Sequence, residues 1–129
     1  MARFVLLYHD CPPDYVRPSH WDLMLEVGDI LRTWALVTLP QSWETWRTRT
    51  AERFPDCRPV AEEELVSAEA LGDHRRDYLE FEGDVSGGRG HVVRVARGEY
   101  EVEDDSPALW LVSLRENGVT RQIQLNCKL

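Results

Sequence analysis

The stretch from Ser19 to Val27, SHWDLMLEV, carries the pattern on which the predicted fold depends. In a β-strand, alternate side chains point to opposite faces. One face of this stretch is wholly apolar and is expected to pack into a core, and the other is expected to look into a cleft or solvent. The apolar face consists of Trp21, Leu23, Leu25 and Val27. The polar face consists of His20, Asp22, Met24 and Glu26.

The polar face offers a candidate metal site. His20 and Asp22 leave the strand in the same direction, about 6–7 Å apart by the rise per residue. His9, at the end of an earlier apolar run, supplies a second imidazole. Two imidazoles and one carboxylate suit a divalent transition metal such as Mn²⁺, Zn²⁺ or Fe²⁺. The same spacing also fits a solvated histidine–aspartate pair, so both interpretations stay open on spacing alone.

Length and composition predict a single domain over residues 1–129. The three cysteines, Cys11, Cys57 and Cys127, are odd in number and scattered, which fits a reducing compartment. No apolar run approaches the length of a membrane span and no signal peptide is evident, so we expect a cytoplasmic protein without a membrane partner. The formal net charge of −8 argues against broad nucleic-acid binding, although arginines cluster locally.

The remaining patterns predict a mainly β fold, a small barrel or sandwich of short strands. The strands are expected at residues 3–8, 21–27, 30–37, 78–82, 91–96, 99–103, 109–115 and 119–126. Gly28-Asp29 and Asn117-Gly118 are typical of hairpin turns.

Two connections are candidates for helices. A short helix is expected after a Ser42 cap, between residues 40 and 53, with Trp43 and Trp46 on one side. Residues 61–70 fit either a short acidic helix or a strand around residues 65–68.

Several motifs between residue 3 and about residue 115 follow the order found in a known family. They are His9-Asp10, His20-Trp21-Asp22, Leu25-Glu26, Gly28, residues 31–35 (LRTWA), Asp73-His74, Asp77-Tyr78, residues 81–83 (FEG) and residues 97–101 (RGEYE). Together they resemble the 3′-phosphoesterase domain at the N-terminus of bacterial DNA ligase D and its stand-alone relatives. The resemblance implies a small, crescent-shaped antiparallel β-barrel with one or two short helices in the connections and a site on its concave face.

The resemblance also implies a Mn²⁺-dependent activity in DNA end repair. Such an enzyme removes a 3′-phosphate or a terminal ribonucleoside from a DNA 3′ end. A separate ligase or polymerase can then use the 3′ hydroxyl. His9, His20 and Asp22 match the family's metal ligands, the trio that the strand geometry also proposes. Zn²⁺ or another divalent transition metal is the alternative ion.

Three further residues match the family's catalytic groups. His74 and Tyr78 correspond to the histidine and tyrosine that face the scissile phosphate, at the same spacing of four. His74 would stabilise developing charge or donate a proton to the leaving oxygen, and Tyr78 would hold a non-bridging oxygen. Glu26 corresponds to a carboxylate at the end of the metal-bearing strand, in a role that orients a partner.

The chain departs from the family pattern at two cations. Met24 stands where the family has an arginine, and Thr38 stands where it has a lysine. Loss of one preorganised donor to a phosphoryl group typically costs ~10²–10³ in rate, so replacements are needed for full activity. The candidate replacements are Arg47, Arg49, Arg75 and Arg76.

A third departure is the longer loop over residues 10–19, which contains Cys11. As a ligand, Cys11 would bias the site towards zinc; the alternative is a cysteine with no role.

Three functions are therefore open from the sequence. The first is a metal-dependent phosphoesterase, which the retained histidines, Asp22 and Tyr78 favour. The second is a divergent, non-catalytic metal-binding module of a DNA repair complex, which Met24, Thr38 and the acidic charge favour. A protein-partner role for the acidic surface, with no nucleic acid at all, is a third reading.

Overall fold

The fold is known from a computed structural model, which describes residues 2–57, 63–85 and 87–127. One antiparallel sheet in the order β4-β3-β2-β1-β7-β8-β9 dominates it. The strands are β1 (Arg3–Asp10), β2 (His20–Val27), β3 (Ile30–Leu36), β4 (Ala68–Ala70), β7 (His91–Asp105), β8 (Leu109–Glu116) and β9 (Val119–Asn126). Two short strands join its edges, β5 (His74–Arg75) on β3 and β6 (Gly83–Asp84) on β7. The predicted mainly β fold is confirmed.

The two predicted hairpins form where the sequence places them. β2 and β3 pair from Trp21–Leu36 to Val27–Ile30, and Gly28 between them has a φ of +59°. β8 and β9 meet at Asn117 and Gly118, whose φ angles of 49° and 82° match the left-handed pair of a type I′ turn. These local turns fix the register of both hairpins.

The sheet curls into a half-barrel around a large core. Trp34 on β3 packs against Trp110 on β8, and its indole Nε1 donates a hydrogen bond to the carbonyl of Asn126, 2.5 Å away. Because β3 and β8 are not neighbours in the sheet, the face that carries Trp34 is the concave one. The apolar face of β2 lies in this core, as predicted.

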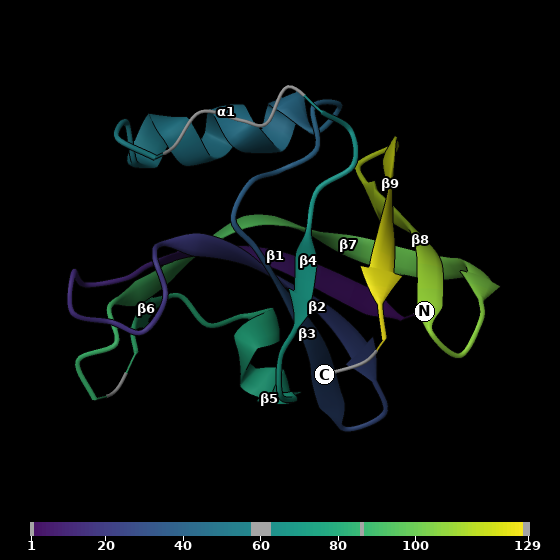
Figure 1. The fold of residues 1–129 in the computed structure, drawn as a ribbon, viewed down its shortest axis with the longest axis horizontal. Coiled ribbons are helices and arrows are strands. Elements are labelled where there is room, and N and C mark those ends of the chain that lie inside the picture. The colour runs from purple at the N-terminus through teal and green to yellow at the C-terminus, as the bar shows by residue number, and fades with distance from the viewer. Residues whose placement is uncertain (1, 58–62, 86, 128–129) are drawn as a thin grey trace.

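One helix, α1 (Glu44–Arg53), covers the open side of the curl, and Figure 1 shows it on the side of the sheet opposite β5. Trp43 and Trp46 are buried in the concave core, as the predicted amphipathic pattern requires. The predicted Ser42 cap is wrong, because Trp43 is the N-cap and the Ser42 hydroxyl bonds instead to Glu64. The carboxylate competes successfully for that hydroxyl.

The convex face of the sheet is also covered, contrary to the expectation of an open polar face on β2. A second core of Val5, Leu7, Met24, Leu31, Leu79, Val85 and Val92 lies on it. It is closed by the 3₁₀-helix η1 (Arg76–Leu79) and by the segment after β6. The sequence pattern of β2 alone does not reveal this cover.

Three further boundaries differ from the prediction. The predicted strand at residues 78–82 is wrong: Tyr78 and Leu79 both pack on the second core, and consecutive side chains of a strand cannot share a face. The predicted strands at residues 91–96 and 99–103 are one long strand, β7. Its pairing with β1 and with β8 contains irregularities in register, which allow the strand to bend. In the segment of residues 61–70, only Ala68–Ala70 forms a strand, β4, at the end of the range where a strand was considered, and residues 63–67 form neither helix nor strand; residues 61–62 lie outside the description.

Candidate metal centre

His9, His20 and Asp22 lie together on the convex face of the sheet. His9 on β1 is the cross-strand partner of His20 on β2, so the long loop between them starts and returns at the same place. Asp22 Oδ1 is 3.0 Å from His20 Nε2, and Asp22 Oδ2 is 3.8 Å from His9 Nδ1. All three residues are buried. The resemblance implied a site on the concave face, and here the trio occupies the opposite one.

Backbone carbonyls orient both imidazoles. His9 Nε2 is 2.6 Å from the carbonyl oxygen of Arg89, and His20 Nδ1 is 2.8 Å from that of Pro18. A carbonyl only accepts, so in each ring that nitrogen carries the proton. The neutral rings then turn the lone pairs of His9 Nδ1 and His20 Nε2 towards the carboxylate of Asp22. Such outer hydrogen bonds are the usual way in which proteins fix metal-binding histidines.

Asp22 supplies the observation that fits a cation best. Its Oδ1 is buried and makes no hydrogen bond within the described part of the chain, although His20 Nε2 is 3.0 Å away. The two atoms are near but not aligned on each other. A separation of about 3 Å is that of neighbouring ligands around an octahedral ion with bonds of about 2.1 Å, where both lone pairs point at the ion. The geometry of this pair therefore fits a shared divalent ion.

The electrostatics of the two histidines differ. Burial lowers the pKa of His9, which keeps its ring neutral and able to bind a metal near pH 7. Burial also acts to lower the pKa of His20, but the nearby Asp22 carboxylate outweighs this effect, and the pKa of His20 is raised.

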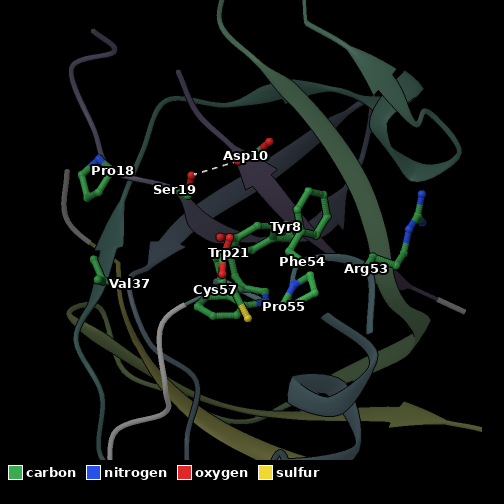
Figure 2. Close-up of a pocket in the computed structure, with 11 residues that line it drawn as sticks. Tyr8, Asp10, Pro18, Ser19, Trp21, Val37, Arg53, Phe54, Pro55 and Cys57 are labelled. Carbon is green, nitrogen blue, oxygen red and sulfur yellow. Dashed lines mark hydrogen bonds between the residues drawn. The ribbon is translucent and has the colours of Figure 1, made fainter. Parts of the chain in front are cut away.

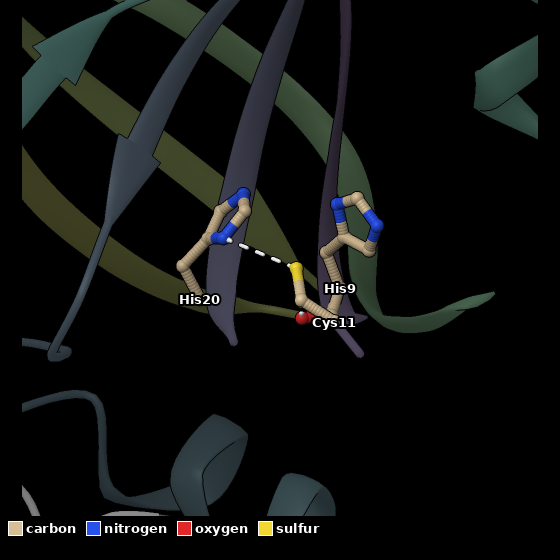
Figure 3. Close-up of side chains that lie close together, drawn as sticks. All are labelled: His9, Cys11 and His20. Atoms are coloured by element: carbon tan, nitrogen blue, oxygen red, sulfur yellow. Dashed lines mark hydrogen bonds between the residues drawn. The ribbon is translucent and has the colours of Figure 1, made fainter. Parts of the chain in front are cut away.

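A second set of donors shares the two histidines. Donor atoms of His9, Cys11 and His20 all lie within 4.8 Å of one another, and Figure 3 shows the Cys11 sulfur directed between the two rings. Cys11 Sγ is 3.9 Å from His20 Nδ1. Burial raises the pKa of the Cys11 thiol to about 11, so the sulfur is a thiol at neutral pH unless a metal displaces its proton.

A small hollow of about 90 Å³ opens beside the trio. His74 and Tyr78 line it together with His9, His20 and Asp22, so five of the predicted site residues meet there. The ring of His74 meets that of Tyr78 edge-on, with centroids 5.6 Å apart, and His74 Nδ1 is 3.0 Å from the Gly72 carbonyl. His74 reaches the hollow because β5 pairs with the outer edge of β3.

Glu26 lies apart from this hollow, at the far end of β2. Its carboxylate binds Arg3 at 2.9 Å and Arg76 at 2.5 Å, so it is held by cations and not by a ligand histidine. The same contact places Arg76 in an ion pair instead of on a phosphate. Neither residue lines the hollow, and their predicted roles find no support there.

The other predicted phosphate-binding arginines are also elsewhere. Arg75 follows His74 in β5 and therefore points the opposite way, into solvent. Arg47 lies on α1, separated from the hollow by the sheet. Arg49 on the same helix pairs with Glu116 at 2.7 Å. Sequence clustering of arginines did not indicate which of them face the site.

Two arginines that sequence reasoning missed line the hollow: Arg17 and Arg89. Arg17 lies in the long loop and forms an ion pair with Glu69 at 2.6 Å. Arg89 lies in the glycine turn between β6 and β7, whose backbone also orients His9. The one sequence signal was the loop over residues 10–19, which is longer than in the family that the motifs resemble and which contains Arg17.

A larger pocket of about 650 Å³ lies on the concave side, where the ends of β1, β2 and α1 meet. Figure 2 shows Tyr8, Trp21 and Phe54 along its wall, with Arg53 and Asp10 at its edge. The sheet separates these aromatic rings from the histidine trio, which does not line this pocket.

Gly90 lets the glycine turn approach β1. Its φ is +87°, and a Cβ there would be 2.0 Å from the carbonyl oxygen of Asp10. We expect Gly90→Ala to cost at least about 2 kcal/mol of unfolding free energy, from the strained backbone and the clash. It should also weaken metal binding, because the neighbouring Arg89 carbonyl orients His9.

Urea unfolding and a Mn²⁺ titration measure both effects. Gly88→Ala is the matched control, because Gly88 also has a positive φ, +68°, but a Cβ there meets no atom within 4 Å. Equal losses in the two variants would contradict the role given to the close approach.

The ion pair between Glu26 and Arg3 should lose its contribution to stability in acid. The hydrogen bond from the Arg3 side chain lowers the pKa of Glu26 from 4.5 to about 2, against the opposing effect of burial. A lowered folded-state pKa stabilises the protein above pH 4.5, and this contribution disappears as the pH falls to about 2. The difference in unfolding free energy between the wild type and Glu26→Gln should therefore shrink over this range. A difference that stays constant with pH would show that the ion pair is not linked to folding.

Comparison of the sequence with known protein families and with curated proteins finds no match for this chain. The described residues contain no helix long and apolar enough to cross a membrane. Cys11, Cys57 and Cys127 are free thiols. The interpretation of the site thus depends on its own geometry and on the motif resemblance.

Proposed function

We propose that the protein is a divalent-metal-dependent phosphoesterase that acts on DNA 3′ ends, removing a 3′-phosphate or a terminal ribonucleoside. Mn²⁺ is the proposed metal, held by His9 Nδ1, His20 Nε2 and the Asp22 carboxylate. The observation that carries the proposal is the buried Asp22 oxygen without a hydrogen bond in the described structure, facing two imidazoles that carbonyls have already oriented.

The chain's own groups suit the remaining chemistry. A bound divalent ion polarises a phosphoryl oxygen and lowers the pKa of a bound water. His74 donates through Nδ1 to the Gly72 carbonyl, which leaves Nε2 to exchange a proton with the leaving oxygen. The Tyr78 hydroxyl can donate a hydrogen bond to a non-bridging oxygen. Their edge-on ring contact restricts both side chains in the hollow.

We propose that Arg17 and Arg89 take the place of the arginine and the lysine that the family has at the positions of Met24 and Thr38. Both line the hollow, and a guanidinium can bind two phosphate oxygens at once. Arg17 already binds Glu69, so a phosphate would exchange with that carboxylate. The hollow of about 90 Å³ is well below the roughly 300–1,000 Å³ of pockets that enclose whole small-molecule ligands, so it would take a phosphoryl group and not a whole nucleotide. The sugar and base would then stay outside.

A second candidate function is a metal-binding module without catalysis. Met24, Leu71, Val85 and Val92 give the hollow an apolar wall that offers no hydrogen bond to a phosphate. This wall favours a structural ion over a reacting ester.

A primer-template with a 3′-phosphate separates the two functions. The purified protein is incubated with this substrate and Mn²⁺, beside the same reaction in chelator and the variant His74→Ala. An enzyme releases phosphate only with Mn²⁺ and loses most of the rate in the variant, about 10²-fold or more for a proton donor. Tight Mn²⁺ binding without phosphate release would favour the binding module.

A further inference from the structure

The position of Cys11 gives the two histidines a second possible ligand. Cys11 is the second residue after His9, in the loop that makes this chain longer than the family pattern. Its sulfur and one nitrogen from each histidine lie within 4.8 Å of one another. Neighbouring ligands of tetrahedral zinc are about 3.5 Å apart, given bonds of about 2.0–2.3 Å. Shifts of about 1 Å would therefore bring the three atoms onto one ion.

His20 faces the two candidate ligands with different nitrogens. Its Nε2 is 3.0 Å from Asp22 Oδ1, whereas its Nδ1 is 3.9 Å from Cys11 Sγ. One ion cannot bind both nitrogens of a single ring. The carboxylate and the thiol therefore belong to two mutually exclusive ways of binding an ion.

We propose that the site has two binding modes that share His9 and His20: an oxygen mode with Asp22, for Mn²⁺, and a thiolate mode with Cys11, for Zn²⁺. The thiolate is the softer ligand and selects zinc, whereas Mn²⁺ prefers the carboxylate. The inference depends on the two histidines of the proposed site and not on the proposed reaction.

The protons balance in both modes. In the oxygen mode, His20 keeps its proton on Nδ1 and donates it to the Pro18 carbonyl, 2.8 Å away. In the thiolate mode, Cys11 releases its proton to solvent and the His20 proton moves from Nδ1 to Nε2. There it is next to Asp22 Oδ1, the buried oxygen that has no hydrogen bond in the described structure. A carboxylate behind a zinc-bound histidine is a common outer-shell arrangement.

The consequence for the proposed enzyme is inhibition by zinc. In the thiolate mode Asp22 no longer binds the ion, and His20 turns its other nitrogen to it. Zn²⁺ would then displace Mn²⁺ one for one and stop the reaction.

Co²⁺ is a suitable probe because a cobalt–thiolate bond gives a near-ultraviolet charge-transfer band. The full chain is titrated with Co²⁺ as wild type, Cys11→Ser, Asp22→Asn and Cys57→Ser, the last being a control thiol outside the cluster. We expect the band in all variants except Cys11→Ser, and Zn²⁺ should abolish it. Zinc affinity, measured by competition with a chromogenic chelator, should fall at least about tenfold in Cys11→Ser, equivalent to about 1.4 kcal/mol.

Mn²⁺ binding, measured by calorimetry on the same proteins, separates this inference from the proposed function. We expect Asp22→Asn to lose Mn²⁺ binding and Cys11→Ser to keep it. Absence of the band from the wild type, an equal band in Cys11→Ser, or simultaneous binding of one Mn²⁺ and one Zn²⁺ would overturn the two modes. A wild-type band without any Mn²⁺ binding would leave the thiolate mode standing and defeat the oxygen mode together with the proposed function, whereas Mn²⁺ binding without the band would defeat the thiolate mode alone.

Discussion

Replacing Asp22 with asparagine should abolish Mn²⁺ binding and reduce phosphate release by at least ~10²–10³-fold. The change keeps the size of the side chain but removes the only negative charge of the proposed ligand set. His9 and His20 would remain oriented by the Arg89 and Pro18 carbonyls, so the loss would come from the ligand and not from the fold. Calorimetric titration with Mn²⁺ and the 3′-phosphate assay measure the two effects.

Thermal unfolding distinguishes this loss from simple destabilisation. Mn²⁺ at about 100 times its dissociation constant should add about 2.7 kcal/mol to the wild type and nothing to Asp22→Asn. Asp29→Asn is the matched control, because Asp29 is an exposed carboxylate in the turn that follows the same strand. Equal stabilisation of both variants by Mn²⁺ would contradict the assignment of Asp22.

Replacing Trp34 with alanine should cost about 3–5 kcal/mol of unfolding free energy, the largest effect on stability that we expect. Trp34 is 1% exposed, packs against Trp110 across the curl and donates a hydrogen bond to the Asn126 carbonyl. The Arg32 guanidinium lies over both tryptophan rings, 5.3 Å from the centroid of Trp34 and 4.6 Å from that of Trp110. These contacts join β3 to the far end of the sheet.

Chemical denaturation measures this cost. Val37→Ala, at a side chain that is 53% exposed just after the same strand, should change stability by less than about 0.5 kcal/mol. A comparably small change in Trp34→Ala would mean that the curl does not depend on this tryptophan.

The parts of the fold that depend on local pattern could be predicted from the sequence. The alternation in β2 and the turn at Gly28 predict the first hairpin, and Asn117-Gly118 predicts the last. The burial of Trp43 and Trp46 on one side of α1 follows from their helical spacing. Local chemistry dictates each of these features.

Tertiary contacts decided what the sequence could not show. The polar face of β2 looked open because nothing in residues 19–27 indicates that Leu79 and Val85, far along the chain, cover it. Residues 78–82 alternate like a strand, but the second core requires Tyr78 and Leu79 on one side. Such long-range packing overrides local propensity.

For the candidate site, the ligand trio was proposed from strand spacing and motif order, and the structure brings its members together through the pairing of His9 with His20. The arginines that line the hollow are not the predicted ones, because arginine clusters in sequence do not indicate the direction of the side chains. Arg75 points away from the hollow that His74 lines, whereas Arg17 and Arg89 reach it from loops. Loop conformation is the level at which single-sequence reasoning is weakest.

Diffraction from crystals soaked in Mn²⁺, with anomalous data collected at the manganese edge, tests the central claim most directly. We predict one strong anomalous peak on the convex face, within about 2.0–2.3 Å of His9 Nδ1, His20 Nε2 and the Asp22 carboxylate. A peak confined to exposed carboxylates, or no peak while these three groups keep their positions, would contradict it.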